Sequence, residues 1–500
     1  MKNRKIGIII SYINTGLNMV CGLFLSSFLL RMLGDTEYGI YQTIASFANY
    51  LILLEFGTGT VMTRNISMCR GRNASKEEIQ RNVTTVWMLA CLLCAVIGVF
   101  GLVFYLNIGN IYAATLTAQQ ITYAKDIFLF VLIHLLSSFL MQTLNGVVLA
   151  HEHYTYGSAV AIFRTVLRTT LLVALVFFRR SSLIIAQVDA GISILLMCIS
   201  MMYLYKNFRI VPKLGRMDQQ IIRVTAPLSV ALFLQTIVNQ ANNNVDKFLI
   251  GIKLSPESVS LYSVAMYVFS IFSSLTTIPI SMYAPTVVKQ VQQGVPMKQL
   301  QKTMVAPCRL TVITGGMIYF GFIAMGKPFV ELVYGSSYVE AWLLAVVVMT
   351  PKYISMINGV VENILDAKNK RMAPSVALIC TTIANILLTL VWLDKWGVIG
   401  AAWATAICTI LGQTLFMNIY YKKKLGVDVM YLFREAFAGI LPWFVIGCVA
   451  SYFVGSLIDN GILTLIVRFV VFCGIVCGGY LIRGIREPER ELLNKILRRG

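Results

Sequence analysis

Long apolar segments follow one another along the whole chain, each separated from the next by a short polar stretch. A segment of about 20 apolar residues can cross roughly 30 Å of hydrocarbon as a helix, and a bilayer admits only helices and closed barrels because backbone polar groups must be paired. We therefore predict an all-α integral membrane protein with about 14 transmembrane helices. The expected spans are residues 6–33, 39–61, 83–106, 126–150, 157–178, 182–205, 224–251, 260–286, 304–326, 341–366, 374–393, 398–421, 435–458 and 462–482.

The composition agrees with this class. Hydrophobic residues make up 57% of the 500 residues and charged residues only 13%, whereas soluble domains are nearer a quarter charged. The net charge of +20 could indicate a nucleic-acid partner, but the basic residues lie in the loops between spans rather than in one patch. Basic loops set the orientation of spans, so we expect the lipid bilayer, and not nucleic acid, as a partner.

The distribution of Lys and Arg predicts that both termini are cytoplasmic. The segments on the side of the N-terminus carry about four times as many Lys and Arg as the opposite side, and such an excess marks the cytoplasm. The basic residues on the outer side are Arg31, Lys125, Arg179, Arg180, Lys253, Lys327 and Lys395. The tail at residues 483–500 is expected to be cytoplasmic, with a basic amphipathic helix at 487–499 on the anionic inner leaflet.

An internal repeat divides the expected spans into two sets of six. Spans 1–6 and 7–12 correspond at a shift of roughly 221 residues, and an even number of spans makes the repeats parallel. Two facing lobes would enclose a central cavity. The predicted domains are an N-lobe at 1–206, a cytoplasmic linker at 207–223, a C-lobe at 224–421, two further spans within 422–482, and the tail.

Polar residues recur at helical spacing on several expected spans, where they could line that cavity. The alternative is hydrogen bonding between helices, for which Asn, Ser and Gln are common in bilayers. On the seventh span they are Gln235, Asn239, Asn242 and Asp246; on the tenth, Lys352, Ser355, Gly359, Glu362 and Asp366; on the fourth, His134, Ser138, Met141 and Asn145.

Three cations are expected near the middle of the membrane. Arg164 and Arg168 lie one turn apart on the fifth span, and Lys352 lies at a similar depth on the tenth. A charge at that depth is costly and usually faces a wet cavity. We therefore predict an anion site here rather than structural pairing. Lys247 adjoins Asp246, so its charge could equally be neutralised locally.

Ionisable groups that could couple transport to an ion form a second set. Glu362 and Asp366 lie near the inner end of their span and could bind a coupling ion or close a gate. His134 could carry a proton or could be a satisfied polar residue. We expect no metal site, catalytic residue or cofactor beyond a coupling H⁺ or Na⁺. The short outer loops disfavour a glycan polymerase or ligase, which would need catalytic acids outside the membrane.

Short motifs in the first twelve spans are similar to one transporter family. The first are Leu29-Leu30-Arg31-Met32-Leu33-Gly34, Glu37-Tyr38-Gly39-Ile40-Tyr41 and Leu53-Leu54-Glu55-Phe56-Gly57-Thr58-Gly59, ending at Arg64. Fainter ones are Asp246-Lys247-Phe248-Leu249-Ile250-Gly251, Gly326-Lys327-Pro328-Phe329 and Gly397-Val398-Ile399-Gly400-Ala401-Ala402. In their order and spacing the chain resembles the polysaccharide (O-antigen-type) flippases of the multidrug/oligosaccharidyl-lipid/polysaccharide exporter superfamily.

The resemblance implies a V-shaped, two-lobed transporter in a bacterial inner membrane. Such a protein would flip an undecaprenyl-pyrophosphate-linked oligosaccharide from the inner to the outer leaflet by alternating access, for the synthesis of cell-surface polysaccharide. It would act with lipid-linked oligosaccharide and could contact polysaccharide-assembly enzymes. The resemblance implies that cations of the cavity contact the pyrophosphate, and depth alone, rather than a matched motif, carries this role to Arg164, Arg168 and Lys352. Arg31 and Arg64 occupy motif positions, and Glu55 stands where related sequences often have Asp.

Two related functions stay open. A flippase for a lipid-linked peptidoglycan precursor would show the same features. A cation-coupled multidrug exporter of the same superfamily would favour twelve spans and a more acidic, aromatic cavity. A scaffold that transports nothing would leave the buried cations without a purpose.

Overall fold

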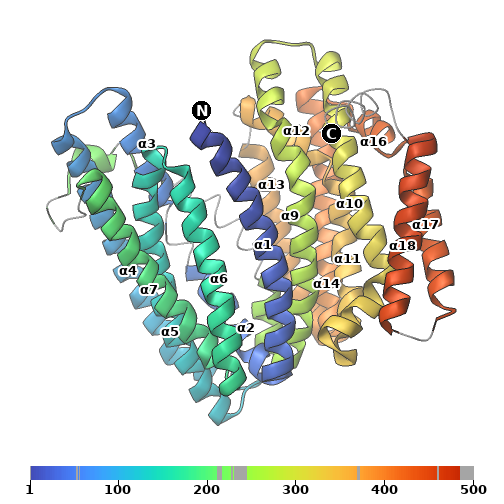
Figure 1. Cartoon of the computed structure of the whole chain (residues 1–500), viewed down its shortest axis with the longest axis horizontal. Helices are drawn as coiled ribbons and strands as arrows, with labels where there is room; N and C mark the ends of the chain where they lie inside the picture. Colours follow the sequence, from blue (N-terminus) through green and yellow to red (C-terminus); the bar gives the residue numbers. More distant parts are fainter. Residues whose placement is uncertain are drawn as a thin grey trace. The chain divides into compact units, whose positions relative to one another are not determined.

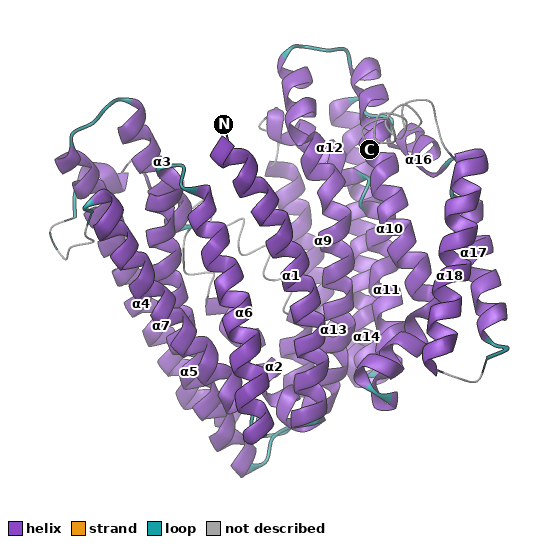
Figure 2. Ribbon diagram, viewed as in Figure 1, coloured by secondary structure: helices purple, strands orange, loops and turns teal. Residues whose placement is uncertain are grey.

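The computed structural model describes residues 2–51, 55, 57–210, 215, 217–223, 225–226, 229, 245–368, 372–458 and 461–484. Within these ranges the regular structure is helical and contains no strand (Figure 2). Ten of the helices are long and apolar enough to cross a membrane, and the number rises to twelve if each of two bent helix pairs is one span. The all-α membrane fold is therefore confirmed. The count of fourteen stays a prediction, because the spans expected at 39–61 and 224–251 include residues outside this description.

The chain forms two compact units, Met1–Ser260 and Leu261–Gly500. The first unit includes residues 245–260, which the sequence analysis placed in the C-lobe. The predicted lobes, linker and repeat stay predictions. The helices that begin in the first unit are α1 (Lys2–Leu33), α2 (Asp35–Leu51), α3 (Thr58–Gly71), α4 (Lys76–Ile111), α5 (Ala118–Ala150), α6 (Tyr154–Phe178), α7 (Leu183–Phe208) and α9 (Pro256–Gln292).

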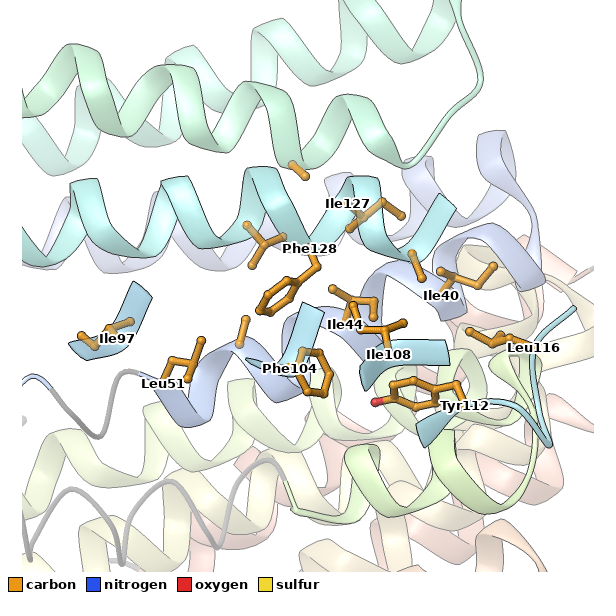
Figure 3. Close-up of a cluster of buried hydrophobic side chains, with 14 of the residues drawn as sticks. Ile40, Ile44, Leu51, Ile97, Phe104, Ile108, Tyr112, Leu116, Ile127 and Phe128 are labelled. Carbon is orange, nitrogen blue, oxygen red and sulfur yellow. The ribbon is translucent and has the colours of Figure 1, made fainter. Parts of the chain in front are cut away.

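Helix α5 is the centre of the first unit. It packs against α2, α3, α4, α6 and α7, and Figure 1 shows it beside α4 and α7. A buried apolar cluster of this unit includes Ile44 of α2, Phe104 of α4 and Phe128 of α5 (Figure 3). Leu51 and Ile97 lie at one end of this cluster (Figure 3) and also line the cavity described below. The apolar packing thus holds α2, α4 and α5 in fixed positions around the cavity.

Glycines of the third motif allow α3 to approach α5 closely. Gly57, at the start of α3, has a φ of 63°, a conformation that glycine adopts without strain. A Cβ atom on Gly146 of α5 would lie 2.4 Å from the carbonyl oxygen of Gly59. Beside this contact, the hydroxyl oxygens of Thr58 and Thr143 lie 2.8 Å apart. Small residues and hydroxyl pairs are the usual means by which membrane helices pack backbone to backbone.

Glu37, the acidic residue of the second motif, forms hydrogen bonds that connect several helices. One carboxylate oxygen of Glu37 accepts hydrogen bonds from the Tyr123 hydroxyl and from the backbone N–H of Ser182, both at 2.8 Å. Ser182 is the residue before α7, where a helix leaves backbone N–H groups unpaired and favours an anion. Glu37 therefore ties the starts of α2, α5 and α7 together.

The second unit is built around α10 (Met297–Tyr334), which packs against α11 (Glu340–Ser355), α12 (Asn358–Ala367), α16 (Val429–Phe437), α17 (Leu441–Gly455) and α18 (Gly461–Gly479). Its other helices are α13 (Met372–Trp396), α14 (Val398–Thr409) and α15 (Met417–Tyr420), with π-helical turns at Ile410–Phe416, Tyr421–Leu425 and Tyr480–Gly484 and a 3₁₀ turn at Ser336–Tyr338. The two bent pairs are here: the chain turns by 51° before α12 and by 48° between α16 and α17.

A buried arginine stabilises the second bend. Arg309 of α10 is 1% exposed, and its Nη1 donates to the carbonyl oxygens of Ala438 at 2.8 Å and Glu435 at 3.4 Å. These carbonyls stand at the end of α16, where a helix leaves acceptors unpaired. The guanidinium thus satisfies acceptors that the break exposes.

Candidate functional site

A cavity of about 320 Å³ lies within the first unit. Its wall combines apolar side chains with polar and charged ones, and all of them belong to residues 41–189. The lining residues are Tyr41, Ala45, Ala48, Leu51, Glu55, Ile97, Val131, His134, Leu135, Ser138, Phe139, Gln142, Arg164, Ala186 and Asp189. A mostly apolar pocket with a few convergent polar groups is the usual form of a small-molecule site.

Arg168 of α6 is paired with Asp189 of α7. Its Nε donates to Oδ1 of Asp189 at 2.5 Å and its Nη2 donates to Oδ2 at 2.9 Å, which makes a two-pronged ion pair. The Tyr41 hydroxyl donates to the same Oδ2 at 3.4 Å. Such pairs are geometrically specific, and the carboxylate neutralises the charge of the guanidinium. Structural pairing, which the sequence analysis ranked second, is thus present at Arg168.

His134 of α5 lies beside this ion pair, and its partners define its protonation. Its Nδ1 is 3.0 Å from the carbonyl oxygen of Asp189 and 2.6 Å from Oγ of Ser193. A carbonyl oxygen only accepts, so Nδ1 carries the hydrogen. Nε2 is 3.5 Å from Nη2 of Arg164, and a guanidinium only donates. Nε2 is therefore the acceptor, and these contacts correspond to a neutral imidazole protonated at Nδ1.

Arg164 differs from Arg168 although it lies one turn away on the same helix. It lines the cavity, is half-buried, and makes a long contact with His134. Among the residues that the structure describes, no carboxylate lies within 4.0 Å of its guanidinium, in contrast to Arg168. The cavity therefore contains a cation whose charge no neighbouring carboxylate cancels by direct contact.

Uncharged polar groups continue along the cavity on α5. His134, Ser138 and Gln142 are spaced by four residues and so share one face, and all three line the cavity. Ser138 donates to Oγ of Ser193 at 3.1 Å. The sequence analysis found the first two but chose Met141, which is buried, instead of Gln142. Glu55 contributes a carboxylate to the same wall.

The predicted residues of the second unit are near the break between α11 and α12. Lys352 is half-buried in the last turn of α11, and Glu362 of α12 is exposed and close enough to attract it electrostatically. The side chain of Asp366 lies outside the described residues. The roles of these three residues stay predictions.

The remaining predicted site residues that the structure describes lie outside the cavity wall of the first unit. Arg31 is exposed in the last turn of α1, and Arg64 is exposed on α3. Asp246 is 5% exposed and Lys247 half-buried, in a short helix at residues 245–253. Asn239 and Asn242 lie outside the described residues.

Asp189 is the principal residue that sequence reasoning missed. It is the only charged residue of the span expected at 182–205, and a carboxylate at that depth is costly unless it is paired. That signal was available, but only the cations were ranked by depth. In the described part of the chain, no three His, Cys, Asp or Glu side chains are grouped so that they could hold a metal ion.

Comparisons with known proteins agree with the fold. A curated relative, the probable low-salt glycan biosynthesis flippase of Haloferax volcanii, is 24% identical over 193 residues, which are 37% of this chain and 39% of that protein. The match thus spans about two-fifths of the relative's length.

Solved transporters share the fold at low identity. The lipid II flippase MurJ in an inward closed conformation has a TM-score of 0.71 and 16% identity, covering 95% of this chain and 100% of that one. An inward-facing multidrug resistance MATE family transporter of the MOP superfamily has a TM-score of 0.62 and 13% identity, covering 83% of this chain and 96% of that one. The fold that the resemblance implied is thus confirmed.

A family model described as polysaccharide biosynthesis protein matches residues 5–291. This segment contains the whole described cavity, from Tyr41 to Asp189, and the first three motifs. Because the match covers more than half of the 500 residues, the chain belongs to the polysaccharide biosynthesis protein family.

Proposed function

We propose that this membrane protein is a flippase that moves a lipid-linked oligosaccharide from the inner to the outer leaflet, with undecaprenyl pyrophosphate as the carrier. The family match, the curated glycan flippase relative and the transporter fold support this proposal. The observation that carries it is Arg164, a cation without a carboxylate partner in direct contact, in the wall of a cavity within the membrane-spanning part of the chain.

The proposed roles follow from the chemistry of the cavity. Arg164 binds a phosphate oxygen, since a guanidinium matches phosphate geometry and stays charged. Ser138 and Gln142 offer donors and acceptors that suit sugar hydroxyls. Arg168 contributes by holding Asp189, and Lys352 supplies a cation in the second unit. For release on the outer side, the outward state must bind the substrate weakly enough for it to dissociate, so moderate affinity is expected.

The orientation follows from the same proposal. With both termini cytoplasmic, the protein sits in the bacterial inner membrane, where lipid-linked glycan is assembled on the cytoplasmic face. No step in this transport breaks or makes a covalent bond in the substrate, so the protein acts as a transporter and not as an enzyme. Contacts with polysaccharide-assembly enzymes would be made through the cytoplasmic or outer loops.

The test is the leaflet location of the lipid-linked glycan in depleted cells. A membrane-impermeant reagent that modifies the glycan should label it in cells with the wild-type protein and fail to label it after depletion. Complementation with wild type, but not with Arg164→Gln produced at the same level, should restore labelling. Normal labelling after depletion, in cells lacking any redundant flippase, would contradict the proposal.

Two other functions are distinguished by the same cells. The fold likeness to the lipid II flippase favours a peptidoglycan precursor as the second candidate, and accumulation of that lipid in the protected leaflet would identify it. The likeness to a multidrug transporter favours toxin export as the third. In that case depletion would leave both lipids correctly placed and would increase sensitivity to toxins.

A further inference from the structure

We infer that the cavity of the first unit takes up an anion and a proton together, with Arg164 receiving the anion and Nε2 of His134 receiving the proton. The inference rests on the proposed function only in assuming that the transported lipid is anionic. It begins from the contact between Nη2 of Arg164 and Nε2 of His134, which is 3.5 Å long and therefore weak.

In the structure as it stands, Arg164 opposes protonation of His134. The guanidinium points an N–H group at the lone pair of Nε2, and a proton added there would bring two cations into contact. An anion that binds Arg164 has the opposite effect. It competes for the guanidinium, uncovers the lone pair and adds negative charge beside the imidazole, and each of these changes favours a proton on Nε2.

The other side of the imidazole is fixed. Nδ1–H is held by the carbonyl oxygen of Asp189 and by Ser193, and the side chain of Asp189 is itself held by Arg168. The imidazole ring therefore keeps its orientation when the guanidinium of Arg164 turns away from it to bind an anion. The only nitrogen that can gain a proton is Nε2, and it faces Arg164.

Among the charged groups around His134, Arg164 has the main influence on whether the imidazole is protonated. Arg168 of α6 and Asp189 of α7 cancel each other in their ion pair, and Tyr41 of α2 donates to that pair. On α4, Sγ of Cys94 donates to the backbone carbonyl oxygen of Leu136, close to His134 in sequence, whereas Tyr105 meets Lys125 nearer the start of α5. From α3 the charged group that contacts α5 is Arg70, which donates to the carbonyl oxygen of Ala150, the last residue of α5 and 16 residues from His134. Glu55 shares the cavity and is the one rival for the proton.

Thermodynamic linkage gives the sign and the size of the effect. If anion binding promotes proton uptake, then protons strengthen anion binding by the same free energy. Anion affinity should therefore fall as pH rises, by at most about tenfold per pH unit for one linked proton. Uptake at a fixed pH should likewise not exceed about one proton per anion.

The experiment measures proton uptake directly. Purified full-length protein in nanodiscs of zwitterionic phosphatidylcholine, which carries no net charge, is titrated calorimetrically with inorganic pyrophosphate in buffers of different ionisation enthalpy. Two variants replace the titratable imidazole of His134 by an amide, and each of them preserves a different contact of the ring. His134→Asn keeps a donor near the Nδ1 position, and His134→Gln can keep an acceptor for Arg164. Protons gained by pyrophosphate itself are common to all proteins and cancel in the comparison.

Wild type should take up more protons than either His134 variant, while both variants still bind pyrophosphate with an affinity that depends less on pH. Glu55→Gln removes a negative charge from the cavity wall and should strengthen anion binding, but it should keep the extra proton uptake of wild type. Arg164→Gln should lose at least about tenfold in affinity. Equal uptake in wild type and both His134 variants would overturn the inference, as would uptake abolished by Glu55→Gln. Absence of pyrophosphate binding to wild type would overturn the anion site.

The failure of this inference is distinguishable from failure of the proposed function. The leaflet assay uses the natural glycan in cells and does not involve proton measurement. Uptake linked to His134 in a protein that leaves glycan orientation unchanged would keep the paired site and remove the flippase proposal. Glycan transport by a protein that takes up no proton with the anion would keep the flippase proposal and remove the paired anion and proton site.

Discussion

Two arginines one turn apart on α6 have different surroundings, and that difference defines the candidate site at the scale of single residues. Arg168 is held by Asp189, whereas Arg164 meets only the lone pair of His134 among the contacts described for it. Sequence reasoning identified both arginines by type and depth. It could not separate them, because the partner of Arg168 is on another helix and depends on how α6 and α7 are rotated about their axes.

Arg168 and Asp189 should stabilise the first unit only when both charges are present. Asp189→Asn or Arg168→Gln alone would leave one charge without its partner, and we expect each to cost about 2 kcal/mol, less than for a fully buried pair because Arg168 is 32% exposed. The double variant should recover part of that loss. Thermal unfolding of the purified proteins tests this cycle, and additive single losses would show that the two side chains do not interact.

Arg164 should matter for transport rather than for stability. Its only described hydrogen bond is long, so Arg164→Gln should leave the melting temperature nearly unchanged while transport of the glycan falls by about tenfold or more. Arg164→Lys should retain part of the activity, since it keeps the charge but not the planar fork. Leaflet labelling and melting curves of the same preparations check this. Wild-type transport by Arg164→Gln would remove the residue from the site.

At the scale of elements, helix positions were easier to predict than helix contacts. The apolar segments gave the approximate locations of α4, α5, α6, α7 and α10, because hydropathy reports length directly. Gly57 and Gly59 were identified only as part of a family motif, whereas in the structure Gly59 accommodates the backbone of α5. A contact between two helices can be predicted only if the positions of both helices are known, whereas a sequence pattern describes one helix at a time. The bend between α16 and α17, stabilised by Arg309, was missed for the same reason.

The contact between α3 and α5 predicts a position that tolerates no side chain. In Gly146→Val, the new carbons would meet the Gly59 carbonyl and the Met62 side chain, since a Cβ there already lies 2.4 Å and 2.9 Å from them. We expect a loss of about 1–3 kcal/mol in stability. Gly98→Val on α4 is the matched control, because no heavy atom lies within 4 Å of a Cβ at Gly98. Equal melting temperatures for the two variants would contradict the close approach.

At the scale of the whole molecule, the fold does not decide the function. A lipid II flippase and a multidrug transporter share it at 16% and 13% identity, so the substrate must be selected by side chains on a common frame. In the first unit the side chains that we propose for this role are a cation without a direct carboxylate partner, a histidine and a row of neutral polar groups. The apolar segments predicted the membrane-spanning helices, whereas the class of substrate was predicted only from motifs that resemble a flippase family.

The direction of transport depends on how the chain is oriented, and orientation is testable with two loops of the first unit. Lys76 at the start of α4 and Ala114 after its end are both exposed. The excess of Lys and Arg places Lys76 in the cytoplasm and Ala114 outside. In intact cells an impermeant maleimide should therefore label Ala114→Cys and not Lys76→Cys, with the parent protein measured alongside because it contains eleven free cysteines. Permeabilised cells should label both variants. Labelling of Lys76→Cys alone in intact cells would show that the protein has the opposite orientation. The cavity would then have to load its substrate from the outer face.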